Sequence, residues 1–133
     1  MPPPPPPPAH LRALRALEQL QREELPAQGR GKEFHFRLSE ILRGYLGERF
    51  GFDALDRTTE ELLAALTRLP TPGLDFARFE ALCREGDLVK YAKAPATPSD
   101  CKVAIESAFS FVHATTPQPP GKPGAGPSQG AAA

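Results

Sequence analysis

The side chains that do chemistry in enzymes occur in this chain, but their spacing assembles no familiar reaction centre. The histidines His10, His35 and His113 lie far apart and belong to no HExxH or CxxC sequence, which common zinc sites contain. The acidic pairs at 23–24 and 60–61 fall where solvated helix ends carry carboxylates. We therefore expect no metal-binding residue and no pair of carboxylates for acid-base catalysis.

The sequence also gives no indication of nucleophilic catalysis or of phosphate binding. No serine stands in a nucleophile-elbow sequence, and no glycine-rich phosphate loop occurs, although enzymes of those classes need them. Cys83 and Cys101 have no metal-site spacing, so we expect two buried or half-buried free thiols, with a disulfide as the alternative. The prediction is a protein that is not an enzyme and has no cofactor.

The amino-acid composition argues against further classes of protein. The chain has 133 residues, with 16 Lys and Arg against 16 Asp and Glu, and the two signs are interleaved. This balance lacks the basic footprint of a nucleic-acid-binding protein. No window reaches the roughly 18 to 20 apolar residues that span a bilayer, and prolines stand where a signal peptide would be basic and then apolar.

The two ends differ in composition from the middle of the chain. Residues 1–8 contain seven consecutive prolines, which predict a stiff polyproline II spacer more than an SH3 ligand, because flanking basic residues are missing. Residues 115–133 are rich in proline, glycine and alanine and are expected to be a disordered tail. The foldable domain is then 9–114, large enough for one core without disulfides or metal.

The middle region has the periodicity of helices. Apolar residues recur at steps of three and four, with no alternation typical of strands. The pattern predicts an all-α fold, a small monomeric bundle of about five helices, at about 9–24, 30–50, 59–69, 76–86 and 98–112. The second helix has an aromatic-rich stripe made of Phe34, Leu38, Ile41, Leu42, Tyr45 and Phe50.

Local capping signals mark where helices begin and end. Thr58 followed by Glu61 predicts a capping box, and Asp75 and Thr97 are expected to cap the next two helices. Gly51 and Gly86 are expected to end helices two and four. Val103 in helix five is expected to pack on the core.

The segment 87–93, Asp-Leu-Val-Lys-Tyr-Ala-Lys, is the candidate functional surface. After the glycine at 86 it is expected to be a short helical turn or an extended connector. Its residues Asp87, Lys90, Tyr91 and Lys93 either cover the core or form a docking surface with a cationic, aromatic rim. Gly44 and Gly47 in helix two mark an alternative docking groove, because glycines inside helices permit close approach of another segment.

Three sequences together resemble a known family. They are RLSEILRGYL from Arg37, TTEEL from Thr58, and DLVKYAK from Asp87. Across about 11–112 the chain resembles the helical cytoplasmic region that follows the membrane span of BatD-like, uncharacterised bacterial proteins. Such proteins are typically encoded beside MoxR-type AAA+ ATPases and von Willebrand factor A domain proteins.

The resemblance implies a protein-interaction module within a membrane-anchored accessory protein. Its implied partner is a MoxR-type ATPase or a von Willebrand factor A protein. The implied location is the cytoplasmic face of the inner membrane, reached through a tether that this sequence lacks; the chain alone is expected to be cytoplasmic. The alternative is a stand-alone soluble enzyme or a metal-binding helical protein.

Overall fold

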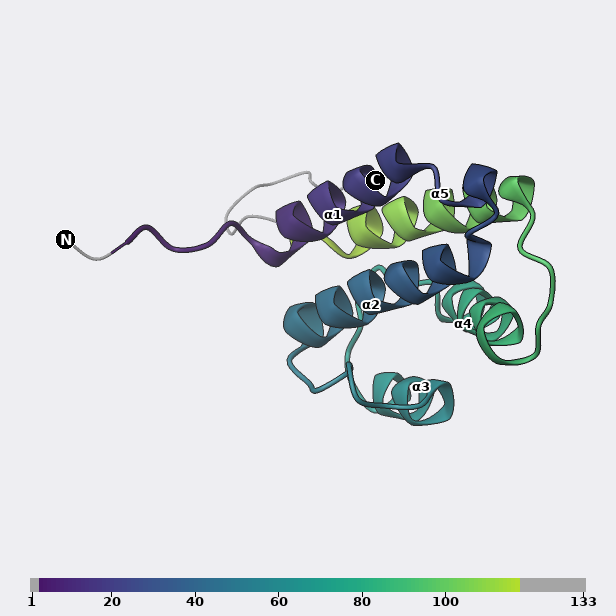
Figure 1. Ribbon diagram of the computed structural model, residues 1–133. Helices are drawn as coiled ribbons and strands as arrows, with labels where there is room; N and C mark the ends of the chain where they lie inside the picture. The colour runs from purple at the N-terminus through teal and green to yellow at the C-terminus, as the bar shows by residue number, and fades with distance from the viewer. Residues whose placement is uncertain (1–2, 118–133) are drawn as a thin grey trace, which may run out of the picture.

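The computed structural model describes residues 3–117, and every regular element in that range is a helix (Figure 1). This confirms the all-α class with five α-helices, while the expected tail beyond 117 lies outside the described residues. Before the first helix, Pro3 to Pro8 are exposed and irregular, and Pro8 has the polyproline II angles φ −55° and ψ 153°. The elements are α1 (Ala9–Glu23), the 3₁₀ turn η1 (Pro26–Gln28), α2 (Gly31–Phe50), α3 (Thr59–Thr67), α4 (Phe76–Tyr91) and α5 (Pro98–Thr115).

The starts of α3, α4 and α5 follow the capping chemistry predicted from sequence. At α3 the Thr58 hydroxyl accepts from the Glu61 amide at 3.1 Å, and the Glu61 carboxylate accepts from the Thr58 amide at 2.9 Å. At α4 the Asp75 carboxylate accepts from the Arg78 amide, and at α5 the Thr97 hydroxyl accepts from the Asp100 amide. Each cap satisfies amides that a helix cannot pair internally.

Helix α2 is the centre of the bundle. It packs against α1, α4 and α5, while α1 and α5 also contact each other and α3 packs on α4. Figure 1 shows α1 and α5 side by side on one side of α2, with α3 on the opposite side. The expected stripe of α2 is largely correct: Phe34, Leu38, Leu42 and Tyr45 are buried, and Ile41 and Phe50 are half-buried.

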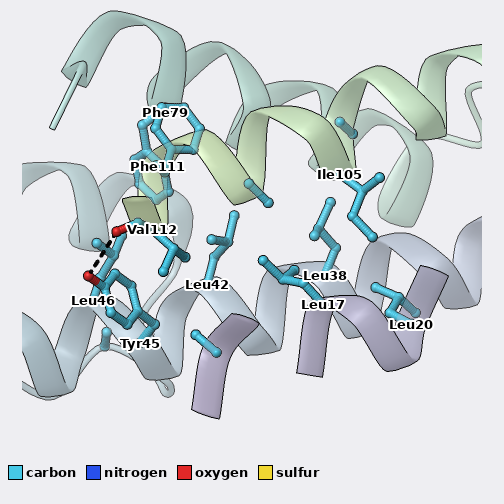
Figure 2. Close-up of a cluster of buried hydrophobic side chains, with 14 of the residues drawn as sticks. Leu17, Leu20, Leu38, Leu42, Tyr45, Leu46, Phe79, Ile105, Phe111 and Val112 are labelled. Atoms are coloured by element: carbon cyan, nitrogen blue, oxygen red, sulfur yellow. Dashed lines mark hydrogen bonds between the residues drawn. The ribbon is translucent and has the colours of Figure 1, made fainter. Parts of the chain in front are cut away.

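The core between α2 and α5 includes a buried polar contact between Tyr45 and Thr115. Figure 2 shows Tyr45 among Leu46, Phe111 and Val112, and Phe79 of α4 meets Phe111 edge to face with ring centroids 5.6 Å apart. The Tyr45 hydroxyl lies 2.8 Å from Oγ1 of Thr115. Thr115 is the last residue of α5 and is buried, so the helical domain extends one residue past the boundary expected at 114.

The ends of the outer helices meet near the last turns of α2. Arg12 in α1 forms an ion pair with Glu48, and Nε of Arg49 donates to the Thr115 carbonyl at the end of α5. Helices α1 and α5 run antiparallel in Figure 1. The first turn of α1 and the last turn of α5 therefore lie at the same end of the bundle.

The predicted end of the fourth helix is wrong. Helix α4 passes through Gly86 and continues to Tyr91, so most of 87–93 is helical and only its last two residues form a connector. Gly86 is buried, and a side chain there would begin 3.7 Å from Nδ1 of His35. That distance is an ordinary van der Waals contact, so the space at this position does not require a glycine. The packing of α4 against α2 outweighs the low helix propensity of Gly86. Val103 is also not core, because it is exposed on α5.

The chain itself occupies the space beside one of the two central glycines. A Cβ on Gly47 would lie 2.7 Å from the carbonyl oxygen of Phe52, so Gly47 permits the close approach expected of it, and Gly51 ends α2 with φ 77°. Gly44 has no such neighbour, since only Leu55 Cδ2 comes as near as 4.0 Å. The surface beside these glycines is therefore partly covered by residues 52–55.

Candidate functional site

The structure separates the four predicted docking residues. Asp87, Lys90 and Tyr91 occupy the last turns of α4 and line one open groove. Lys93 lies after the helix in a left-handed conformation with φ 60° and lines a different, smaller hollow. The first three residues belong to a common site, and the fourth does not.

The groove runs between α2, α4 and the segment that leads into α3. Its volume is about 800 Å³. Residues from three parts of the chain line it: Glu33, Phe36, Arg37, Ser39, Glu40 and Arg43 from α2; Leu55, Asp56, Arg57, Thr58 and Thr59; and Asp87, Lys90 and Tyr91 from α4. We call this feature the α2–α4 groove.

Exposed apolar side chains line the α2–α4 groove. Phe36 is 43% exposed, Tyr91 is 71% exposed and Leu55 is 55% exposed. The rings of Phe36 and Tyr91 meet edge to face, with centroids 6.0 Å apart, which is a favourable aromatic geometry. Clustered apolar side chains in a hollow are typical of binding surfaces on small soluble domains.

Lys90 lies beneath these rings and is not the exposed rim cation predicted from sequence. Its side chain is only 6% exposed, and Nζ is 3.8 Å from Asp87 Oδ1. The same Nζ lies 5.5 Å from the ring centroids of both Phe36 and Tyr91, within cation–π range. Burial lowers the pKa of Lys90, an effect that Asp87 opposes.

Arg43 joins the two walls of the groove. Its Nε donates to the Ser39 hydroxyl at 3.0 Å, its Nη1 donates to the Arg57 carbonyl, and its Nη2 donates to Thr59 Oγ1 at 3.2 Å. One guanidinium on α2 thereby holds the segment before α3 in place. The wall that carries Leu55 is positioned before any partner arrives.

A second, smaller cavity lies behind the groove and shares Ser39, Arg43, Asp87 and Lys90 with it. Its volume is about 30 Å³, and His35 and Cys83 also line it. His35 is buried, with Nε2 3.8 Å from Sγ of Cys101. Burial lowers the pKa of His35, and the positive charge of Lys90 lowers it further.

The two cysteines are free thiols, as expected. Burial raises the pKa of both Cys83 and Cys101 to about 11, so each is protonated near neutral pH and is a poor nucleophile. Within residues 3–117, no three His, Cys, Asp or Glu side chains gather in a way that could hold a metal ion. The chemistry that the groove offers is recognition by apolar, aromatic and charged contacts.

Sequence reasoning did not identify Phe36, Leu55 or Arg43 as site residues. Phe36 could have been identified from the sequence, because it is an aromatic residue on the polar side of α2, outside the apolar stripe. Leu55 lies in the irregular segment between α2 and α3, where no helical periodicity indicates whether a leucine is buried or exposed. Arg43 had no distinguishing signal, since its role depends on a segment that approaches from elsewhere.

The groove cannot be assigned by comparison with characterised proteins. The chain matches no protein-family model, and searches of curated proteins and of solved structures likewise find no match. Among the described helices, none combines the length and apolar character needed to cross a membrane.

Proposed function

We propose that this domain is a non-enzymatic protein-interaction module that binds its partner in the α2–α4 groove. The observation that carries the proposal is the exposed pair of rings, Phe36 and Tyr91, stacked over the buried charge of Lys90. A few residues carry most of the binding energy in protein interfaces, and tyrosine is among the residue types enriched there. Here the two rings and Lys90 lie together in one hollow.

Contacts within the domain hold the groove walls in place, which supports binding without a large rearrangement of the backbone. Arg43 holds one wall through its bonds to Ser39, Arg57 and Thr59. Outside the groove, Arg84 of α4 pairs with Glu60 of α3 at 2.7 Å and links these two helices. Because these contacts order the walls in the free protein, less conformational entropy remains to be lost on association.

We further propose a MoxR-type AAA+ ATPase as the partner, with the domain acting as the cytoplasmic part of a membrane-anchored accessory protein. This finer proposal is supported by the family resemblance of the segments that begin at Arg37, Thr58 and Asp87. Two of these segments contribute groove residues from α2 and α4, and the third contributes Thr58 and Thr59. The sequences that carry the resemblance thus converge on one surface.

Two leucines provide a matched test of the groove. Leu55 and Leu88 are each 55% exposed, but only Leu55 lines the α2–α4 groove. Binding of the purified chain to the MoxR-type ATPase encoded nearest its gene is measured by biolayer interferometry. Leu55→Ala and Tyr91→Ala are each expected to weaken binding about tenfold or more, which corresponds to about 1.4 kcal/mol, whereas Leu88→Ala should not.

The possible outcomes test separately whether the groove binds a partner protein and whether that partner is the ATPase. Binding of the von Willebrand factor A protein in place of the ATPase, with the same dependence on Leu55, would retain the groove and replace the partner. Equal effects of Leu55→Ala and Leu88→Ala would show that the groove is not the binding surface. Melting temperatures of all three variants serve as the control for folding.

A further inference from the structure

We infer that the α2–α4 groove recognises a partner segment that places a carboxylate next to an apolar side chain, with the carboxylate at Lys90 and the apolar group against Phe36, Tyr91 and Leu55. The inference rests on the proposed function and adds the chemistry of the ligand. Two cations on the inner part of the groove carry it.

The first cation is the Lys90 ammonium, which has unused hydrogen-bonding capacity. An ammonium has three N–H donors, yet within residues 3–117 its only carboxylate neighbour is Asp87, at 3.8 Å. That separation is longer than a direct hydrogen bond. The two ring faces offer electrostatic attraction to the charge but no acceptor atoms. A carboxylate oxygen from a partner would give this ammonium a hydrogen-bond acceptor.

The second cation is the Arg43 guanidinium. It is close enough for its charge to lower the pKa of Lys90, and both side chains line the groove and the small cavity behind it. Its bonds to Ser39, Arg57 and Thr59 use three of five donors. Two neighbouring cations with free donors repel each other, and an entering anion relieves that repulsion.

The groove also contains acidic residues, but they lie in different positions from the cations. Glu40 and Asp56 are exposed, whereas Lys90 is buried. Glu33 already pairs with Arg30 at 2.6 Å. The rim carries both signs, because Arg57 is exposed there as well, whereas beneath the rings the two cations Lys90 and Arg43 outnumber Asp87. A ligand is therefore selected by where its carboxylate sits and not by its net charge.

The apolar contact and the charge contact reinforce each other. An aliphatic or aromatic side chain packed on Phe36 and Tyr91 excludes water from above Lys90, and electrostatic attraction strengthens as the local dielectric falls. A carboxylate without an apolar neighbour would leave Lys90 hydrated through the opening. An apolar group alone would cover the ammonium without giving it an acceptor, which carries a desolvation cost.

The test uses a phage-displayed library of random nonapeptides selected on the full chain. Selected peptides are synthesised with a fluorescent label and titrated by anisotropy, each beside a version in which the carboxylate is replaced by the matching amide. We expect enriched peptides to share an Asp or Glu adjacent to an apolar residue, and the amide version to bind at least tenfold more weakly. Binding of the acidic peptide should also weaken with added salt.

Protein variants locate the contact. Lys90→Met keeps most of the apolar stem and should remove the difference between acid and amide peptides, while Lys90→Arg should retain it. Lys102→Met is the control, since Lys102 is an exposed lysine on α5 outside the groove. If Lys90→Met fails to fold, the exchange of acid for amide on the peptide decides the question with unaltered protein.

Failure of this inference can be distinguished from failure of the proposed function. Enriched peptides that depend on Tyr91 but carry no carboxylate, or that bind equally well as amides, would overturn the carboxylate inference and leave the interaction module standing. If no peptide binds in a manner that Tyr91→Ala disrupts, both the inference and the groove as a peptide-binding site are refuted.

Discussion

Removing the hydroxyl of Tyr45 tests the polar contact between α2 and α5. The Thr115 hydroxyl lies 2.6 Å from the Phe111 carbonyl oxygen, and a hydroxyl has a single hydrogen to donate. Thr115 therefore donates to Phe111, and the Tyr45 hydroxyl donates to Thr115 Oγ1 at 2.8 Å. Tyr45→Phe removes the donor, whereas Thr115→Val removes the acceptor and leaves a buried O–H behind.

These two changes should have unequal costs. Tyr45→Phe deletes one net hydrogen bond, worth about 0.5 to 1.5 kcal/mol of unfolding free energy. In Thr115→Val the Tyr45 hydroxyl retains only the Val112 carbonyl, at 3.5 Å, so the cost should rise to about 1 to 3 kcal/mol for a poorly satisfied buried donor. The double variant removes both polar groups and should cost about 1 kcal/mol less than the sum of the single variants.

Urea unfolding of the four proteins measures these free energies. Thr116→Val is a matched control, because the Thr116 hydroxyl donates to the Val112 carbonyl at 2.7 Å in the same way along the helix, and no Tyr45 contact is recorded for it. Thr115→Val must cost more than Thr116→Val. Additive effects of the Tyr45 and Thr115 changes would refute the role of this hydrogen bond in joining the helices.

Three further outcomes follow from burial and backbone geometry. Gly73 has φ 86°, and a Cβ there would lie 2.0 Å from a backbone carbonyl oxygen of α5. Gly29 has φ 75° but open surroundings, so Gly29→Ala should cost only the roughly 1 to 3 kcal/mol of left-handed strain. Gly73→Ala should lower the free energy of unfolding in urea by more than that. Burial holds the pKa of His35 below its unfolded value, so stability should decrease as pH falls below about 6.5, and His35→Leu should reduce that slope. Lys90→Glu should lower the melting temperature because it buries a carboxylate, whereas Lys93→Glu, at an exposed position, should leave it unchanged.

Helix starts were predictable because their chemistry is local. Thr58, Asp75 and Thr97 each satisfy amides within three residues, so the responsible atoms are adjacent in the sequence. The end of α4 was not predictable from the same kind of signal. Gly86 resembles a terminator when only its neighbours are considered, but the surface of α2 around His35 continues to hold α4 in a helix beyond it.

The candidate site could be predicted only in part for a related reason. Asp87, Lys90 and Tyr91 stood out as charged and aromatic residues, and the structure places them together. The burial of Lys90 depends on Phe36, more than fifty residues earlier, and the far wall depends on the contact between Arg43 and the 57–59 segment. No spacing within the sequence encodes which of these segments will meet.

The shared end of α1 and α5 has a mechanical consequence. Arg12 and Thr115 both lie against the last turns of α2, so a load applied between the segments flanking the bundle pulls these two helices apart from one end. Contacts between the two helices then break sequentially from that end, and each break needs only a small force. Optical-tweezer pulling through residues 8 and 116 should give a low rupture force, whereas pulling through the turn at 26–28, at the opposite end of the bundle, and residue 116 should require more.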